Sequence, residues 1–133
     1  MLPFCAVAWE ICIDPARRVT HLRLRGRVTF DDLQDAHRAL GSDAAFDPRF
    51  PIVIDLQAAR EVDLTHAELD AIVARCPVDA GSRRAIVVGN LIVSAIARVY
   101  QFMRQDMTRT PVVRICGSLD EAWSWLRVEP LGS

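Results

Sequence analysis

Polar and apolar residues alternate near the start of the chain, in a pattern typical of strands. Within residues 7–13 and again within 19–25, apolar side chains occupy every second position, as in half-buried strands. The pair Asp14-Pro15 lies between these segments and favours a turn. Together the two segments predict an antiparallel hairpin.

The register of this hairpin follows from the positions of its apolar residues. If Trp9 lies opposite Leu22, every apolar position of one strand faces an apolar position of the other. The same register places Glu10 opposite His21 on the solvent side. We therefore expect paired positions to sum to 31.

Beyond Gly26 the pattern changes between helical spacing and short apolar runs. Capping boxes, in which an acidic residue follows Ser or Thr by three positions, predict three helix starts; the pairs are Thr29 with Asp32, Thr65 with Glu68, and Ser118 with Glu121. Helical spacing also covers residues 91–104, and apolar runs at 51–56, 85–88 and 112–116 predict buried strands. We expect the first helix to end at Gly41 and the second before Pro77.

The resulting order, ββαβαβαβα, predicts an α/β fold. Strands that alternate with helices favour a mostly parallel sheet, here five-stranded with the antiparallel hairpin at its N-terminal end. No segment between elements is long and polar enough to be an interdomain linker. We expect one domain over residues 1–133, with a core at about 7–126.

Composition and charge exclude several partners. The formal net charge is −1, and all sixteen basic residues are arginines distributed along the chain, so nothing attracts nucleic acid or anionic lipid. The most apolar run, residues 85–97, is too short to cross a membrane. Polar residues interrupt the N-terminal apolar stretch early, unlike a signal peptide. We expect a cytoplasmic protein.

The four cysteines do not have the spacing of a zinc site or of a secreted disulfide scaffold. They are Cys5, Cys12, Cys76 and Cys116. We expect them to be small buried apolar residues in a reducing compartment. No nucleotide loop or nucleophile motif occurs, and we predict no cofactor.

Acidic residues provide the best candidate chemistry. Asp55 is expected near the carboxyl end of a buried strand, with Glu61 and Asp63 in the following loop, at the edge where α/β sheets bind ligands. Three carboxylates there could hold Mg²⁺. Acids in such loops usually serve turns and helix starts, however, so we predict no metal site. Thr65 follows this loop, and we interpret it mainly as a helix cap.

Three stretches of the sequence resemble STAS domains, the sulfate-transporter and anti-sigma-factor-antagonist family. They are IVIDL at 52–56, VDLT at 62–65 and DEAWSWL at 120–126, and ARVY at 97–100 is similar to small stand-alone bacterial SpoIIAA-like proteins. The resemblance covers roughly residues 7–126 and rests on hydrophobic pattern. It implies a non-catalytic domain that binds proteins, nucleotides or lipid-like ligands.

Family antagonists carry an Asp-Ser-Ser-Gly stretch at the start of the second helix, where a partner kinase phosphorylates a serine. Here Asp63 matches, whereas Leu64, Thr65 and His66 replace the two serines and the glycine. We therefore expect binding of a protein partner, a kinase or anti-sigma-type regulator, with Asp63, Thr65 and His66 as the candidate surface. Asp55, and Asn90 at the start of the third helix, complete the candidate residues.

Two alternatives remain open. A cavity lined by the third helix would favour a carrier of lipids or other small molecules. Convergence of two or more of Asp55, Asp63, His66 and Cys76 in one cleft would favour an enzyme. The third helix is also apolar over more than the stripe one sheet requires, which predicts a homodimer.

Overall fold

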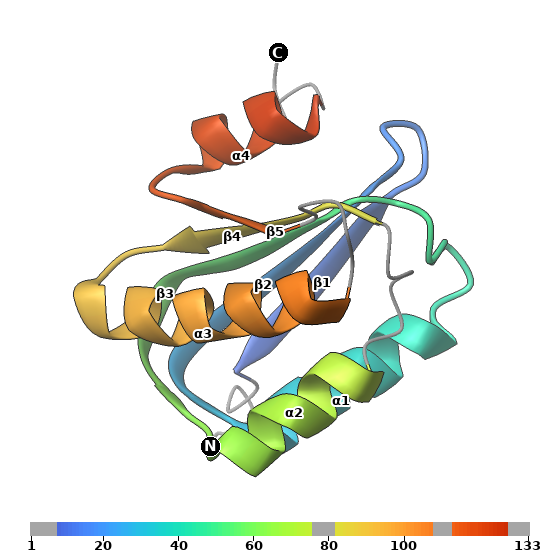
Figure 1. Cartoon of the computed structure of the whole chain (residues 1–133). Helices are drawn as coiled ribbons and strands as arrows, with labels where there is room; N and C mark the ends of the chain where they lie inside the picture. The colour runs from blue at the N-terminus through green and yellow to red at the C-terminus, as the bar shows by residue number, and fades with distance from the viewer. Residues whose placement is uncertain (1–7, 76–81, 108–112, 128–133) are drawn as a thin grey trace, which may run out of the picture.

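The computed structural model describes residues 8–75, 82–107 and 113–127 (Figure 1). One five-stranded sheet has the sequential order β1-β2-β3-β4-β5. Its strands are β1 (Trp9–Asp14), β2 (Val19–Thr29), β3 (Ile52–Asp63), β4 (Arg84–Val88) and β5 (Val113–Cys116). The helices are α1 (Phe30–Ser42), α2 (His66–Arg75), α3 (Leu91–Met107) and α4 (Leu119–Leu126). Only the β1–β2 pair is antiparallel, so the predicted element order and fold class are confirmed.

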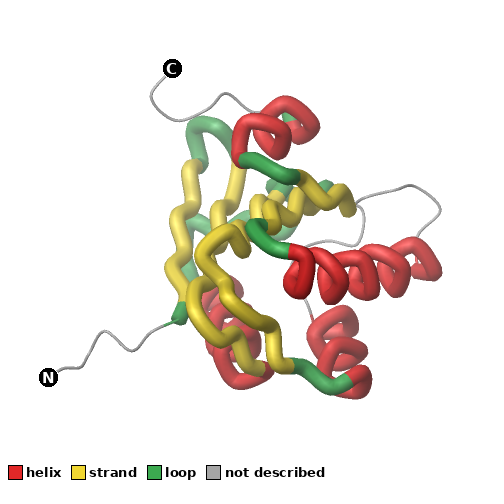
Figure 2. Tube along the Cα trace, turned by 90° about the vertical axis from the view of Figure 1, so that its left-hand side faces the viewer, coloured by secondary structure: helices red, strands yellow, loops and turns green. Residues whose placement is uncertain are grey.

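Helices cover the two faces of the sheet unequally (Figures 1 and 2). The helices α1, α2 and α3 pack on one face, which we call the three-helix face, and α4 alone packs on the other, the one-helix face. Sequential parallel strands with right-handed crossovers place the connecting helices on one side. The last helix is free of that constraint because no strand follows it in the described chain.

Successive residues of the central strands enter different cores. Ile52 and Ile86 belong to the core of the three-helix face, whereas Val53 and Val87 belong to that of the one-helix face. All four are at most 3 % exposed. Burial on both faces explains the continuous apolar runs of β3 and β4.

The hairpin register differs from the prediction by two residues. Trp9 lies opposite Leu24, and Asp14 opposite Val19. The expected register would have left a two-residue loop beginning at Pro15, but such loops need a positive φ at their first residue and proline is fixed near −65°. The chain instead uses a four-residue loop with Arg18 at φ 59°.

A shift of two residues leaves each side chain on its expected face, but it changes the polar partners. Glu10 pairs with Arg23, and His21 pairs with Cys12. His21 is also buried rather than on a solvent-facing surface. The predicted contact of Glu10 with His21 is therefore wrong.

β2 and β3 extend well beyond their predicted ends. The expected loop that carries Glu61 and Asp63 is instead the second half of β3, paired in parallel with the end of β2. The register shifts on both sides of Gly26, whose φ of 68° suits glycine. These irregularities interrupt the apolar pattern, which is why the sequence analysis ended both strands too early.

The helix starts agree with the sequence, and one helix end does not. Reciprocal capping bonds join Thr29 with Asp32 and Thr65 with Glu68. At α4 the Ser118 hydroxyl accepts the N–H of Glu121. The helix α1 continues through Gly41 to Ser42, because glycine in a helix is costly but does not terminate it. Pro77 lies outside the described residues.

Two cysteines lie within the described residues, and only one of them is buried as expected. Cys116 is buried, and burial raises the pKa of its thiol. Cys12 is exposed on the edge strand β1. Cys5 and Cys76 lie outside the described residues. None of the helices in the described ranges is long and apolar enough to span a membrane.

Candidate functional site

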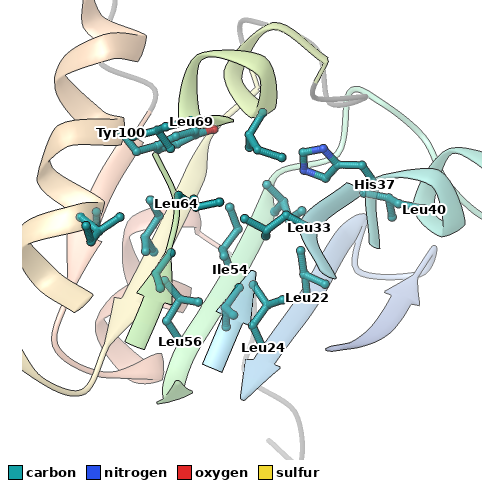
Figure 3. Close-up of a pocket in the computed structure, with 17 residues that line it drawn as sticks. Leu22, Leu24, Leu33, His37, Leu40, Ile54, Leu56, Leu64, Leu69 and Tyr100 are labelled. Atoms are coloured by element: carbon teal, nitrogen blue, oxygen red, sulfur yellow. The ribbon is translucent and has the colours of Figure 1, made fainter. Parts of the chain in front are cut away.

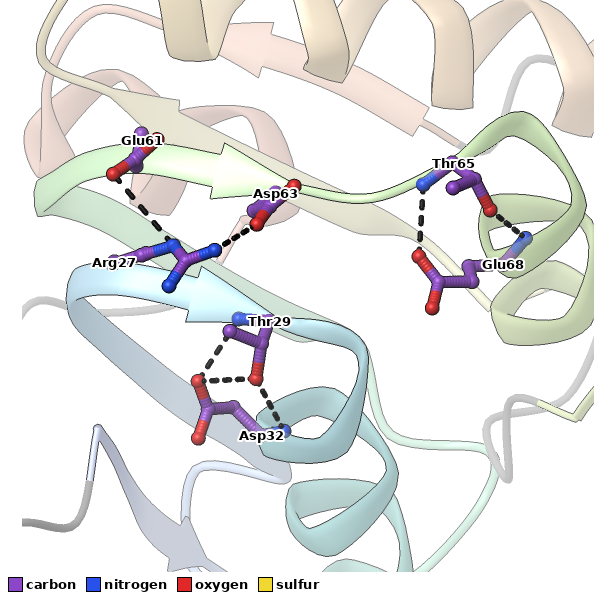
Figure 4. A network of polar contacts seen from close by, with 7 residues as sticks. All are labelled: Arg27, Thr29, Asp32, Glu61, Asp63, Thr65 and Glu68. Carbon is purple, nitrogen blue, oxygen red and sulfur yellow. Dashed lines mark hydrogen bonds and ion pairs between the residues drawn. The ribbon is translucent and has the colours of Figure 1, made fainter.

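The start of α2 brings together part of the predicted surface (Figure 4). Asp63 forms an ion pair with Arg27 of β2 at the end of β3. The exposed Thr65 follows; its hydroxyl accepts the N–H of Glu68 at 3.1 Å, and its own N–H donates to the Glu68 carboxylate at 2.9 Å. Thr65 therefore serves as a helix cap, as the sequence predicts, while remaining at the surface.

His66 and Asn90 differ in how much of each remains available for a partner. The His66 side chain is 77 % exposed, and its Nε2 atom lies 3.8 Å from a carboxylate oxygen of Asp70. Asn90 donates from Nδ2 to the Ala59 carbonyl at 3.1 Å and accepts the Val93 N–H at 2.8 Å. Asn90 thus caps α3 and ties it to β3, whereas most of the His66 imidazole remains exposed.

Asp55 lies away from these residues. It is in the first half of β3 rather than near the carboxyl end of the strand as predicted, and it lies eight residues before Asp63, which is about 25 Å along an extended strand. Its carboxylate is 3.5 Å from His21 Nε2 and 4.0 Å from Arg23 Nε. The predicted cluster of Asp55, Glu61 and Asp63 in one loop does not form. The described residues include no group of three possible ligands that could hold a metal ion.

Sequence reasoning missed a polar cluster on the one-helix face. Glu10, Arg23 and Asp55 lie in a row across β1, β2 and β3, with Arg23 within 4 Å of both carboxylates. They line a pocket of about 310 Å³. Next to it, the Trp123 ring meets His21 edge-to-face at 5.6 Å. Burial, followed by the charge of Arg23, lowers the pKa of His21.

One signal in the sequence could have indicated this cluster. Glu10 and Cys12 on one strand, and His21 and Arg23 on the next, alternate with apolar residues and so share one face. From the sequence we expected that face to be exposed to solvent. The position of Trp123 on α4, which buries His21, could not be deduced from local pattern.

The three-helix face contains an apolar cavity of about 80 Å³ between the sheet and α1, α2 and α3 (Figure 3). Almost all of its lining is aliphatic. The lining comprises Leu22, Leu24, Val28, Leu33, His37, Leu40, Ile52, Ile54, Leu56, Val62, Leu64, Leu69, Ile72, Ile86, Ile96, Ala97 and Tyr100. The cavity is therefore suited to an apolar ligand rather than a charged one.

His37 is one of two polar residues in the cavity wall. Burial, with a smaller contribution from the charge of Arg84, lowers the pKa of His37 to about 4. The imidazole is therefore neutral at pH 7 and adds no charge to the cavity. His37 and Ile72 also line an outer groove between α1 and α2, so these two side chains separate the cavity from the surface there.

The helix α3 exposes an unusual amount of apolar surface. Leu91 is 88 % exposed, Ile92 68 %, Phe102 65 % and Val99 42 %. Ile92, Ala95, Val99 and Phe102 recur at intervals of three and four residues, so they lie on one side of the helix. We call these four residues the outer stripe of α3.

Comparisons with known proteins support the fold. No family model and no curated protein sequence matches the chain. One similar solved structure is an uncharacterized protein of the DUF3478 family from Shewanella loihica PV-4, described as having a SpoIIAA-like fold. It is 19 % identical, with a TM-score of 0.61, over 90 % of this chain and 93 % of that chain.

A second similar structure is the anti-sigma factor antagonist SpoIIAA in its unphosphorylated form. It is 14 % identical, with a TM-score of 0.57, over 90 % of this chain and 98 % of that chain. Both matches extend over nearly the whole of each chain, so they include the sheet and its helices together. The chain therefore has the SpoIIAA-like fold, as its resemblance to STAS domains predicts.

Proposed function

We propose that the chain is a non-catalytic, cytoplasmic binding domain that regulates a protein partner and self-associates through α3. The outer stripe of α3 carries this proposal, because large side chains such as Ile92 and Phe102 are about two-thirds exposed. Contiguous apolar patches on soluble domains mark interaction sites. The similarity to an anti-sigma factor antagonist supports a regulatory role.

A second copy of the chain fits the outer stripe for a geometric reason. Alternating intervals of three and four residues produce the side-chain arrangement with which two helices interlock. The stripe of one α3 is complementary to the same stripe of another, as a two-fold interface requires. The exposed Leu91 lies next to the stripe and enlarges the contact.

The start of α2 is our proposed surface for a different protein, a kinase or anti-sigma-type regulator. Asp63, Thr65 and His66 are all exposed there, and the Asp63–Arg27 ion pair holds the strand end in place. The other two candidate residues lie outside this surface. Asn90 fixes the start of α3, and Asp55 belongs to the polar cluster on the one-helix face.

The concentration dependence of thermal unfolding tests self-association. A dimer that dissociates on unfolding has a Tm that rises with protein concentration. We expect the Tm of the native chain to rise with concentration and the Tm of Ile92→Glu to stay constant. Ile92 is too exposed to stabilise the core of the monomer, so its replacement should leave the monomer folded. Arg38→Gln, an exposed change on α1 outside the stripe, is the control and should behave like the native chain. A Tm independent of concentration in the native chain would contradict self-association.

The cavity favours a second candidate function, that of a carrier for a small apolar molecule. Its apolar lining between three helices and the sheet supports the carrier alternative, and Ile96, Ala97 and Tyr100 of α3 form part of its wall. Entry between α1 and α2 would require movement of His37 and Ile72.

Xenon, an apolar probe small enough for a cavity of about 80 Å³, tests the carrier function. We expect the native chain to bind the probe and Ala97→Leu to bind it at least about tenfold more weakly, because the added side chain fills the cavity. The same substitution on the outer side of the same helix, Ala95→Leu, is the matched control. Equal probe binding by Ala97→Leu and the native chain would rule out the cavity as the binding site.

A further inference from the structure

Arginine side chains from three distant parts of the sequence converge at the amino-terminal edge of the parallel strands. Arg49 precedes β3, Arg83 precedes β4, and Arg127 follows α4 (Figure 1). Together they line an open pocket of about 380 Å³, which we call the arginine pocket. The rest of its described lining is Pro51, Ser82 and Leu126, so no acidic residue is among the residues described there.

Existing contacts hold two of these guanidinium groups, those of Arg49 and Arg83, in place. Arg49 forms a bidentate ion pair with the Asp47 carboxylate. Its Nε donates to Oδ1 at 3.1 Å and its Nη2 to Oδ2 at 2.9 Å. This contact, with a smaller effect from the charge of Arg18, lowers the pKa of Asp47. Arg83 donates from Nη1 to the Trp125 carbonyl at 3.0 Å.

Arg83 and Arg127 are also positioned by the end of α4. The Arg83 guanidinium lies 5.3 Å from the centre of the Trp125 ring, which fixes its plane. The backbone of Arg127 adopts a left-handed conformation at φ 60°, and its N–H caps the helix through the carbonyls of Ser124 and Trp123. The backbone therefore sets where the Arg127 side chain leaves the helix.

The contact with Trp125 uses only part of the hydrogen-bonding capacity of Arg83. A guanidinium has five N–H donors, and the carbonyl of Trp125 uses one donor of Arg83. Like charges that line one pocket repel one another, so an anion that enters the pocket is favoured electrostatically. Guanidinium groups form paired hydrogen bonds with phosphate oxygens, and groups already held in position lose less freedom on binding.

We propose that the arginine pocket binds a phosphate group, either free or carried on a small molecule. Arg83 and Arg127 contribute the principal charges, and Arg49 completes the pocket wall. Pro51 and Leu126 provide apolar contact for the organic part of a phosphate monoester. The site is separate from the outer stripe of α3 and from the cavity, and it does not depend on the function proposed above.

Calorimetric titration at constant ionic strength tests the pocket, with inorganic phosphate in one arm and phenyl phosphate in the other. We expect saturable binding of one phosphate group per chain. Tighter binding of phenyl phosphate would identify a monoester as the ligand, and equal binding would identify free phosphate. Sodium chloride at the same ionic strength should not compete. Absence of saturable binding in both arms would overturn the proposal.

Substitutions of single arginines test whether phosphate binds in the arginine pocket. Arg127→Gln should weaken phosphate binding at least about tenfold, the effect of losing one charged hydrogen bond. Arg83→Gln should do the same, and Arg127→Gln remains informative if loss of the Trp125 contact unfolds Arg83→Gln. The charge-matched control is Arg60→Gln, an exposed site on β3 outside the pocket. Equal weakening by Arg60→Gln and Arg127→Gln would show that net charge alone attracts phosphate.

Discussion

The two faces of the sheet are built from the same strands but are packed differently. On the three-helix face, long aliphatic side chains leave a cavity between the sheet and the helices. On the one-helix face, small residues such as Ala85 and Ala122 pack with Trp123, and polar residues of the sheet line a pocket beside this core. The contrast indicates that alternating residues of one strand can border an apolar cavity on one side and a packed core with a polar pocket on the other.

Enlarging one alanine on each face should give the largest difference between them. Ala97 of α3 borders the cavity, whereas Ala122 of α4 is fully buried in the core of the one-helix face. We expect Ala122→Leu to lower the free energy of unfolding by about 3 kcal/mol through overpacking, and Ala97→Leu by less than about 1 kcal/mol. Urea unfolding measures both variants. Equal losses would show that the two faces are packed equally tightly.

His37 in the cavity wall should make the free energy of unfolding of the protein depend on pH. In the unfolded chain His37 takes up a proton near pH 6.5, whereas in the folded protein it stays neutral until about pH 4. Acidification from pH 6.5 to 4 should therefore lower the free energy of unfolding by up to about 3 kcal/mol through this residue. Above pH 6.5 the contribution is constant.

The variant His37→Leu isolates this contribution. The difference in unfolding free energy between the native chain and His37→Leu should change across the same pH interval. A flat difference for His37→Leu would mean that the imidazole is hydrated rather than buried beside the cavity.

The capping boxes should give the smallest effects. Removal of one cap by Thr29→Ala or Thr65→Ala should cost about 1 kcal/mol each, because each threonine hydroxyl accepts one helix N–H. Chemical denaturation of the two variants measures the cost. If Thr65→Ala kept full stability but lost a protein partner, Thr65 would be a recognition residue rather than a cap.

Features set by local sequence were predicted well. The helix starts at Thr29, Thr65 and Ser118 follow from residues three positions apart, and their capping contacts are present. The apolar runs of β3 and β4 correctly indicated buried parallel strands. These predictions succeed because the interactions that decide them lie within one turn of helix or one strand.

Features that depend on distant residues were missed. The burial of His21 requires Trp123, and the arginine pocket requires residues from three separate segments. Pro15 changed the hairpin loop, which moved the register by two residues. The candidate site was predicted only in part: Asp63, Thr65 and His66 gather at the start of α2, but Asp55 lies elsewhere on β3.

We propose a second copy of the chain as the cover of the outer stripe of α3. Sedimentation equilibrium over a series of micromolar concentrations measures the mass of the protein in solution. We expect an average mass that approaches twice that of one chain in the native protein and the mass of one chain in Ile92→Glu. A native protein that has the mass of a single chain at every concentration would rule out self-association through α3.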